Sequence, residues 1–208
     1  MHLLALSLCV LRNPIDCFRV LQADRKRFNY LPALVLVLLI VSVRVLFIYL
    51  THYPLQDIKP QNADLLLESA FLIVPLIMWS AANFAVTSIL DGETMMRESM
   101  MAALMSMVPY ILLSIPLALL SHLMSRADAG LFDMIRGAVY LWCGGLFILS
   151  IRVMNSYSLL KSLFVVVANL TVMALMAAIA LLMYALLNQL WMFLEGLVRE
   201  FTYTLRRL

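Results

Sequence analysis

Charged residues are scarce in this chain of 208 residues: Asp, Glu, Lys and Arg together make up 13%, whereas hydrophobic residues make up 64%. A soluble domain is about half apolar and about a quarter charged. The chain has too little polar surface to cover a water-soluble globule, so we expect an integral membrane protein rather than a soluble enzyme. The formal net charge is only +3, and no basic stripe indicates a nucleic-acid partner.

Cysteine and histidine are also few, with three residues of each. Cys9, Cys17 and Cys143 form no CxxC pair, which argues against a disulfide framework or a structural metal site. The chain contains no P-loop, no HExxH motif and no glycine-rich dinucleotide turn. We therefore expect a non-catalytic protein that needs no cofactor and no metal.

Long apolar runs are what the chain does contain. A helix needs about 20 apolar residues to cross a bilayer. Such runs occur near residues 30–50, 65–90, 100–120, 132–151 and 159–187. The sequence therefore predicts an all-α fold: a single membrane domain over residues 1–208, built as a helical bundle of about five transmembrane helices.

Amphipathic segments flank the predicted bundle. Residues 13–28 open with Asn13 and Pro14, which suit the cap and the first position of a helix. Residues 188–208 mix aromatic and charged side chains, as interfacial helices do. We expect both segments to lie in the membrane interface. The first could instead be a basic juxtamembrane segment that fixes topology, and a sixth span in the tail would be interrupted by charges.

The distribution of Lys and Arg predicts the orientation, because cytoplasmic loops carry more of them. With the N-terminus in the cytoplasm, that side holds more basic residues than the far side, both before and after the C-terminal tail is counted. The cytoplasmic set is Arg12, Arg19, Arg25, Lys26, Arg27, Arg97, Arg152 and Lys161. The opposite set is Lys59, Arg126 and Arg136, joined by Arg199, Arg206 and Arg207 of the tail.

Polar residues inside the predicted spans are the first candidates for function. Arg44 lies in the first span, where it could snorkel to the interface, form a buried ion pair or contact a partner. Asn83 follows Trp79 in the second span, and Asn169 lies in the fifth. Buried amides usually form hydrogen bonds between helices.

The turn between the second and third spans is the next candidate. Asp91, Gly92, Glu93 and Thr94 form it, and Glu98 follows. We expect Gly92 to adopt a positive φ, so that Gly92→Val would disrupt the turn. The carboxylates could bind a cation, although solvated side chains or a cap on the next helix are the simpler interpretation.

Proline, glycine and methionine mark helix shape and helix contacts. Pro75, Pro109 and Pro116 fall inside predicted spans and can kink them. Small residues let helices approach closely, and methionine suits an adaptable partner surface, a lipid-facing surface or a core. The small residues are Gly137, Gly144 and Gly145 of the fourth span. The methionines are Met95, Met96, Met100, Met101, Met105 and Met107.

Taken together, these landmarks resemble the Yip family of membrane proteins, named for interaction with Ypt/Rab GTPases in eukaryotes. The resemblance covers nearly the whole chain after residue 12, and the order and spacing of loose motifs around five spans carry it. The motifs are Asn13-Pro14 with Phe18, Trp79 with Asn83, Asp91-Gly92-Glu93-Thr94, Pro109-Tyr110, and Tyr157-Ser158 with Lys161. The short lead-in resembles bacterial-type members, since eukaryotic members carry a long cytosolic N-terminal region.

The resemblance implies five spans, a cytosolic N-terminus and a C-terminus on the far side, with no catalytic residue to transfer. Eukaryotic relatives act in vesicle traffic and membrane shaping, and bacterial relatives resemble accessory proteins of ABC-type transporters. We expect a non-catalytic subunit of the bacterial plasma membrane that associates with other membrane proteins, in particular an ABC-type sugar importer or exporter. An autonomous small-solute transporter or channel, and a membrane-shaping or trafficking factor, remain as alternatives.

Overall fold

The structure is a computed structural model that describes residues 9–23, 30–55 and 63–205. Within these ranges it contains α-helices and short 3₁₀ turns, and no strand. Five of the described segments are long and apolar enough to cross a membrane: Leu31–Leu50, Leu65–Ile89, Met96–Leu123, Arg126–Met154 and Leu159–Arg199. The prediction of an all-α membrane protein with five spans is therefore confirmed.

The first two spans are single helices, α3 (Tyr30–Leu50) and α4 (Leu65–Ile89). Asp64 caps α4, because its Oδ1 accepts hydrogen bonds from the backbone N–H groups of Leu66 at 3.0 Å and Leu67 at 3.3 Å. A carboxylate at this position satisfies free donors and complements the positive end of the helix dipole. The second span thus begins where its polar cap meets the apolar run.

The third span is divided into α5 (Met96–Ser106) and α6 (Val108–Leu120), which meet at Met107. Pro109 lies in the first turn of α6, where its missing N–H leaves no helical hydrogen bond unmade. The interpretation of Pro109 as a kink inside one continuous helix is therefore corrected, because this proline starts a new helix.

α5 forms the centre of the molecule, in contact with α2, α3, α4 and α7. Met101 and Met105 are buried in its core, whereas Met95 is 66% exposed. Of the three roles that the sequence left open for the methionines of the third span, core packing is the one observed for Met101 and Met105. Only the start of this methionine group faces outward.

The fourth span is α7 (Ala129–Met154), and the lead-in forms α2 (Pro14–Ala23), which packs against α7 and α5. Cys17, Phe18 and Leu21 of α2 are buried by this packing. The apolar face of the lead-in therefore rests on protein rather than on lipid. Residues 24–28 of the expected lead-in lie outside the described residues.

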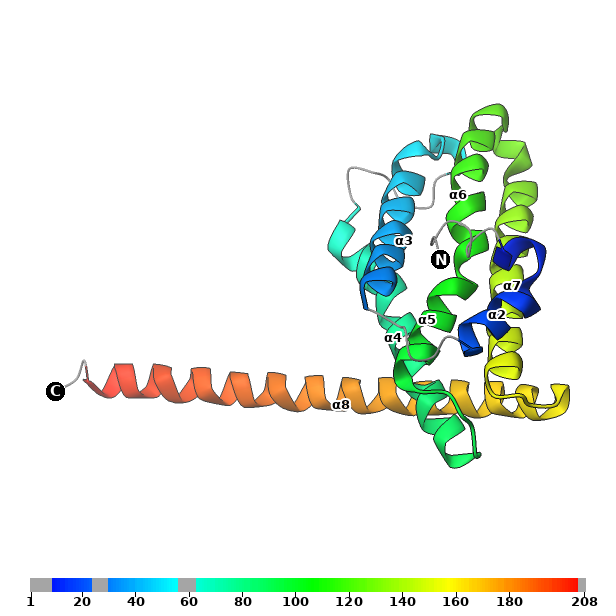
Figure 1. Cartoon of the computed structure of the whole chain (residues 1–208). Helices are drawn as coiled ribbons and strands as arrows, with labels where there is room; N and C mark the ends of the chain where they lie inside the picture. The colour runs from blue at the N-terminus through cyan, green and yellow to red at the C-terminus, as the bar shows by residue number, and fades with distance from the viewer. Residues whose placement is uncertain (1–8, 24–29, 56–62, 206–208) are drawn as a thin grey trace.

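The last helix, α8, runs without interruption from Leu159 to Leu205. Its 47 residues give a length of about 70 Å at 1.5 Å per residue, against about 30 Å for the hydrocarbon core of a bilayer. The separate interfacial helix expected from residue 188 onward is instead the continuation of this span, and residues 206–208 lie outside the described part. α8 crosses the end of the bundle formed by α3, α6 and α7 and extends far beyond it (Figure 1).

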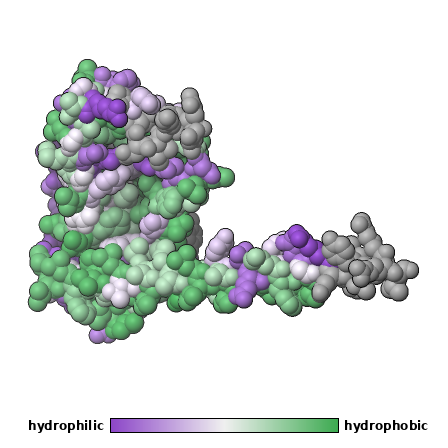
Figure 2. All heavy atoms as spheres, turned by 180° about the vertical axis from the view of Figure 1, so that it is seen from behind, coloured by the Kyte–Doolittle hydropathy of each residue, from purple (hydrophilic) through white to green (hydrophobic). Residues whose placement is uncertain are grey.

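Most of α8 has no neighbour within the described chain. Its first part packs against α4 and α7, but every residue from Ala178 to Arg199 is exposed. Figure 2 shows hydrophobic residues along this helix and over the adjoining end of the bundle. The fold thus buries a central helix and leaves a long apolar helix uncovered.

Candidate functional site

Several residues singled out in the sequence gather at the end of the bundle that α8 crosses. Trp79 and Asn83 lie in the last three turns of α4, and Asp91, Gly92 and Glu93 form the turn that follows. The structure adds the segment from Asn155 to Lys161, which joins α7 to α8 and packs on this turn. We call the turn from Asp91 to Glu93 and the segment from Asn155 to Lys161, taken together, the capped turn.

The backbone of α4 ends in a left-handed residue. Asp91 has a φ of 56°, a conformation that Asp and Asn adopt more readily than other residues with a side chain. The N–H of Gly92 then reaches back to the carbonyl of Thr87 at 2.7 Å. This bond satisfies one of the carbonyls that the end of a helix leaves free.

α7 ends in the same way, close to the end of α4. Ser156 has a φ of 55°, and the N–H of Tyr157 donates to the carbonyl of Arg152 at 3.0 Å. The Ser156 N–H donates to the carbonyl of Val153 at 3.3 Å. These two bonds form a Schellman cap, here on a serine rather than a glycine.

Asn155 ties the two helix ends together. Its Oδ1 accepts hydrogen bonds from the Thr94 hydroxyl at 2.5 Å and from the Thr94 N–H at 3.3 Å. Its Nδ2 donates to the carbonyl of Ile151 at 3.1 Å. Asn155 and Thr94 are each only 5% exposed, so each bond replaces water that these polar atoms have lost.

Two further donors meet at the carbonyl of Leu90, at the end of α4. The Tyr157 hydroxyl donates to it at 3.0 Å and the Lys161 ammonium at 3.1 Å. The ammonium also lies 4.0 Å from the centre of the Tyr157 ring, a favourable cation–π position. A positive charge at the C-terminal end of a helix complements its dipole. Burial raises the pKa of Tyr157, and the nearby Asp91 carboxylate adds to this shift, so the phenol stays protonated and able to donate.

Gly92 is required at this turn for space rather than for its backbone angle. Within the described chain, no glycine has a positive φ, so the expectation of a left-handed Gly92 is wrong, and Asp91 takes that conformation. A Cβ on Gly92 would lie 2.7 Å from the Asn155 Oδ1, the Thr87 Cβ and the Tyr157 hydroxyl. The chain passes so close to the Asn155 segment that only glycine fits.

Asn83 extends the hydrogen-bonded network into the bundle. Its Nδ2 donates to the Ser99 hydroxyl at 2.8 Å, and that hydroxyl donates to the carbonyl of Ser80 at 3.1 Å. Asn83 therefore joins α4 to α5, as buried amides do within membranes. Beside it, Trp79 meets the Phe147 ring edge-to-face at 5.0 Å.

The acidic residues of the turn do not form a shared cation site. Asp91 and Glu93 are exposed, whereas Glu98 is 2% exposed and its Oε2 accepts the Met95 N–H at 3.1 Å. Glu98 thus caps the start of α5. In the described ranges, no three His, Cys, Asp or Glu side chains lie together as metal ligands would.

Arg44 lies apart from the capped turn and forms an ion pair inside the membrane-spanning region. Its Nη2 lies 2.6 Å from the Glu68 Oε2, and its Nε donates to the same oxygen at 3.2 Å. The side chains are 22% and 12% exposed. On α6 and α7, the rings of Tyr110 and Tyr140 stack at 6.0 Å. Of the roles considered for Arg44, pairing is the one observed.

Of the remaining candidates, three glycines have open space around them, and one asparagine has no hydrogen-bond partner in the described part of the chain. Added Cβ atoms at Gly137, Gly144 and Gly145 would meet nothing within 4 Å, so each position has room for a small side chain. Asn169 is fully buried, yet neither its Oδ1 nor its Nδ2 has a hydrogen-bond partner in the described part. The expectation that Asn169 bonds between helices is therefore not met there.

The capped turn holds a fixed geometry. Its bonds fasten the end of α4 to the end of α7, and α8 starts from the same segment at Leu159. Sequence reasoning missed Asn155 as the central residue. The signal available was an Asn-Ser pair directly after an apolar run, which is typical of a left-handed helix end.

A model of the Yip1 domain matches residues 8–196. Searches of curated proteins and of solved structures found no match to this chain. The matched region contains the five spans up to position 196 of α8, together with α2 and the capped turn. Since this model covers most of the chain, the protein belongs to the Yip family.

Proposed function

We propose that this protein is a non-catalytic membrane subunit that associates with other integral membrane proteins, with an ABC-type sugar importer or exporter as its partner. We place it in a bacterial plasma membrane with its N-terminus in the cytoplasm, following the Lys and Arg distribution. The observation that carries the proposal is the uncovered helix α8.

α8 has the composition of a helix that is surrounded on all sides by lipid or by apolar protein. Its most hydrophobic stretch has a mean hydropathy of 2.5, but only 11% of that stretch is buried. A helix in the membrane interface has a strongly polar face and low overall hydrophobicity, whereas exposed Leu181, Leu182, Tyr184 and Leu187 lie on several sides of α8. Lipid or another apolar protein surface must cover it, and its length exceeds what one bilayer crossing requires.

α7 offers a second surface for another membrane helix. Gly144 and Gly145 are exposed and have open space around them. Small residues allow the backbones of two membrane helices to approach closely, and packing contacts drive such association within lipid. An open small-residue face next to an uncovered helix supports association with a partner protein.

The test is purification of the tagged protein from its native membrane in mild detergent, followed by mass spectrometry. We expect transporter subunits in a fixed ratio. A photoreactive amino acid at Leu182, which is 64% exposed on α8, should cross-link to the same subunits. The matched control is Leu123, 85% exposed at the opposite end of the bundle, where we expect no such cross-link. Repeated recovery of the protein alone, with cross-links to lipid only, would contradict the proposal.

An autonomous small-solute transporter is the second candidate, and the Arg44–Glu68 pair favours it. Ionisable residues within spans often mark the paths of ions or substrates. Liposomes that contain only this protein would test it by solute flux, with Arg44→Gln as the inactive variant and Arg199→Gln as the control. No observation favours membrane shaping by two interfacial helices, because α2 buries its apolar face on protein and α8 is continuous.

A further inference from the structure

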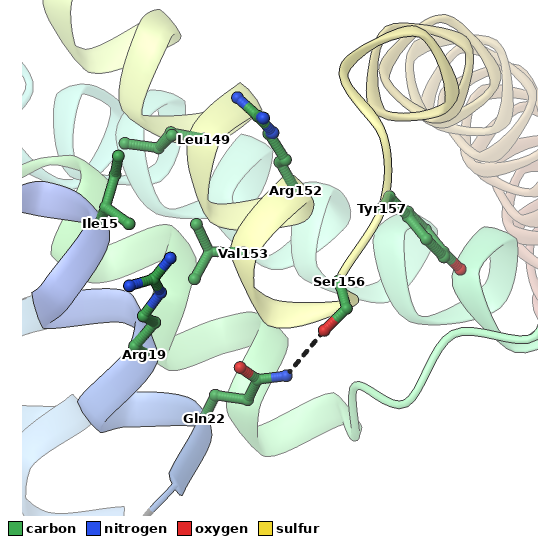
Figure 3. A pocket seen from close by; sticks show the side chains of 8 residues that line it. All are labelled: Ile15, Arg19, Gln22, Leu149, Arg152, Val153, Ser156 and Tyr157. Carbon is green, nitrogen blue, oxygen red and sulfur yellow. Dashed lines mark hydrogen bonds between the residues drawn. The ribbon is translucent and has the colours of Figure 1, made fainter.

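A pocket of about 330 Å³ lies between α2 and the last turns of α7 (Figure 3). Arg19 and Gln22 come from α2, Arg152 from α7, and Ser156 from the bend after α7. The Gln22 Nε2 lies 3.4 Å from the Ser156 hydroxyl and 3.4 Å from the carbonyl of Met154. These long hydrogen bonds close one end of the pocket, where α2 meets the segment that starts α8.

The pocket carries two positive charges with little compensation. Arg19 lies 3.8 Å from Asp16, but both side chains are mostly exposed, and such surface pairs contribute little. In the described part of the chain, the guanidinium of Arg152 has no ion-pair partner. Guanidinium groups bind oxyanions, phosphate in particular, through paired N–H donors. The Ser156 hydroxyl accepts from Gln22 and keeps its own proton as a neutral donor.

The opposite end of the pocket is apolar. Ile15 of α2 and Leu149 of α7 lie near one another there, and Val153 lies between Arg19 and Arg152 (Figure 3). Ile15 is 44% exposed, whereas Cys17, Phe18 and Leu21 of the same helix are buried. Leu149 and Arg152 belong to the last turns of a candidate membrane span. The pocket therefore sits where the hydrocarbon region gives way to the headgroups.

We propose that this pocket binds an anionic phospholipid. Its phosphate would lie between Arg19 and Arg152, and its acyl chains would leave along Ile15 and Leu149 toward the membrane. A free phosphate would use the arginines but would gain nothing from the apolar end. Basic pockets at the end of membrane helices are a known means of holding anionic headgroups, and the volume is at the lower end of that of small-molecule sites. The site does not depend on which protein partner is bound.

A lipid in this position would join α2 to the rest of the bundle. α2 is held by its buried apolar face and by the two long bonds of Gln22. A phosphate contacted by Arg19 of α2 and Arg152 of α7 would add charge-assisted bonds across the same junction. Bound lipid should therefore stabilise the packing of α2.

The test compares phosphatidylglycerol with phosphatidylcholine, by native mass spectrometry and by thermal unfolding of the full chain in mixed micelles. We expect preferential retention of phosphatidylglycerol and a higher unfolding temperature with it. Arg19→Gln together with Arg152→Gln should weaken retention by about tenfold or more, since each arginine supplies charged hydrogen bonds. Arg126→Gln and Arg199→Gln remove the same charge away from the pocket and should leave retention unchanged.

Equal retention of the two lipids, or unchanged retention in the double variant, would overturn the proposal. Stabilisation of the same size by millimolar inorganic phosphate without lipid would show a free-phosphate site instead. If the double variant does not fold, a photoactivatable phosphatidylglycerol on the unmodified protein decides. Adducts on residues 15–22 and 149–156 would support the site, whereas adducts only elsewhere would refute it.

Discussion

The hydroxyl of Thr94 donates a hydrogen bond of 2.5 Å to the side-chain oxygen of Asn155, which is 61 residues further along the chain. Both residues are almost fully buried. The bond joins the turn after α4 to the end of α7, four residues before α8 begins. It therefore fixes the place from which the long apolar helix leaves the bundle.

A double-mutant cycle on this pair should show coupling. Thr94→Val keeps the shape and removes the donor, and Asn155→Ala removes the acceptor. We expect each to lower the free energy of unfolding by about 1–3 kcal/mol, because the partner is left buried and unpaired. The double variant should cost about 1 kcal/mol less than the sum. Titration with SDS in mixed micelles measures these values.

Thr171→Val, at an exposed position of α8, is the control and should change stability by less than about 0.5 kcal/mol. Additive effects of the two substitutions would show that the bond contributes nothing.

Gly92 and Gly144 should respond differently to the same substitution. Gly92→Ala places a Cβ 2.7 Å from atoms of Asn155, Thr87 and Tyr157, whereas Gly144→Ala meets nothing within 4 Å. Overpacking at such a contact costs about 1–3 kcal/mol, so Gly92→Ala should lower the unfolding temperature and the folded yield. Gly144→Ala should be neutral or slightly stabilising, since alanine favours helix. Equal behaviour of the two variants would mean that the turn does not pack on the Asn155 segment.

The five spans could be predicted because each is a long apolar run, and the physics of the bilayer leaves few other structures for such a run. The split at Met107 was less visible, since Pro109 reads equally well as a kink or as the first turn of a new helix. The continuity of α8 was missed because Trp191, Glu195 and Arg199 resemble an interfacial tail. Local composition could not show that the helix continues through this segment without a break.

The site was predictable in part. Trp79, Asn83 and the turn from Asp91 to Thr94 stood out as polar or aromatic residues at span ends. Their meeting with Asn155 depends on α4 and α7 ending side by side, a long-range relationship that no local pattern contains. The pairing of Arg44 with Glu68 has the same origin, because a charge in a span signals that a partner exists but does not name it.

Removing one member of the Arg44–Glu68 pair should destabilise the protein more than removing both members. Arg44→Gln or Glu68→Gln alone leaves one charge without its partner in an apolar setting, which costs about 3–5 kcal/mol for a fully buried pair. With side chains 22% and 12% exposed, we expect the lower part of that range. The double variant should regain much of the loss. SDS titration measures each, with Arg199→Gln as control, because Arg199 and Glu195 pair on an exposed helix face. A double variant as unstable as the sum of the single ones would contradict pairing.

The Cys17 thiol should report whether α2 is docked. Burial, with Cys9 adding, raises the pKa of Cys17 to about 12. The thiolate is the reactive form, so at pH 8 a far smaller fraction of the Cys17 thiol is ionised in the folded chain than in the unfolded chain. The shift has a defined sign for stability: the benefit of burying a neutral thiol is complete below pH 9 and is lost as the pH rises toward 12.

Alkylation with iodoacetamide between pH 7 and 9, read by mass spectrometry, should modify Cys9 first and Cys17 only after denaturation. If Cys17 reacts as fast as Cys9 in the folded protein, α2 is not packed on α7, and the capped end of the bundle is open on that side.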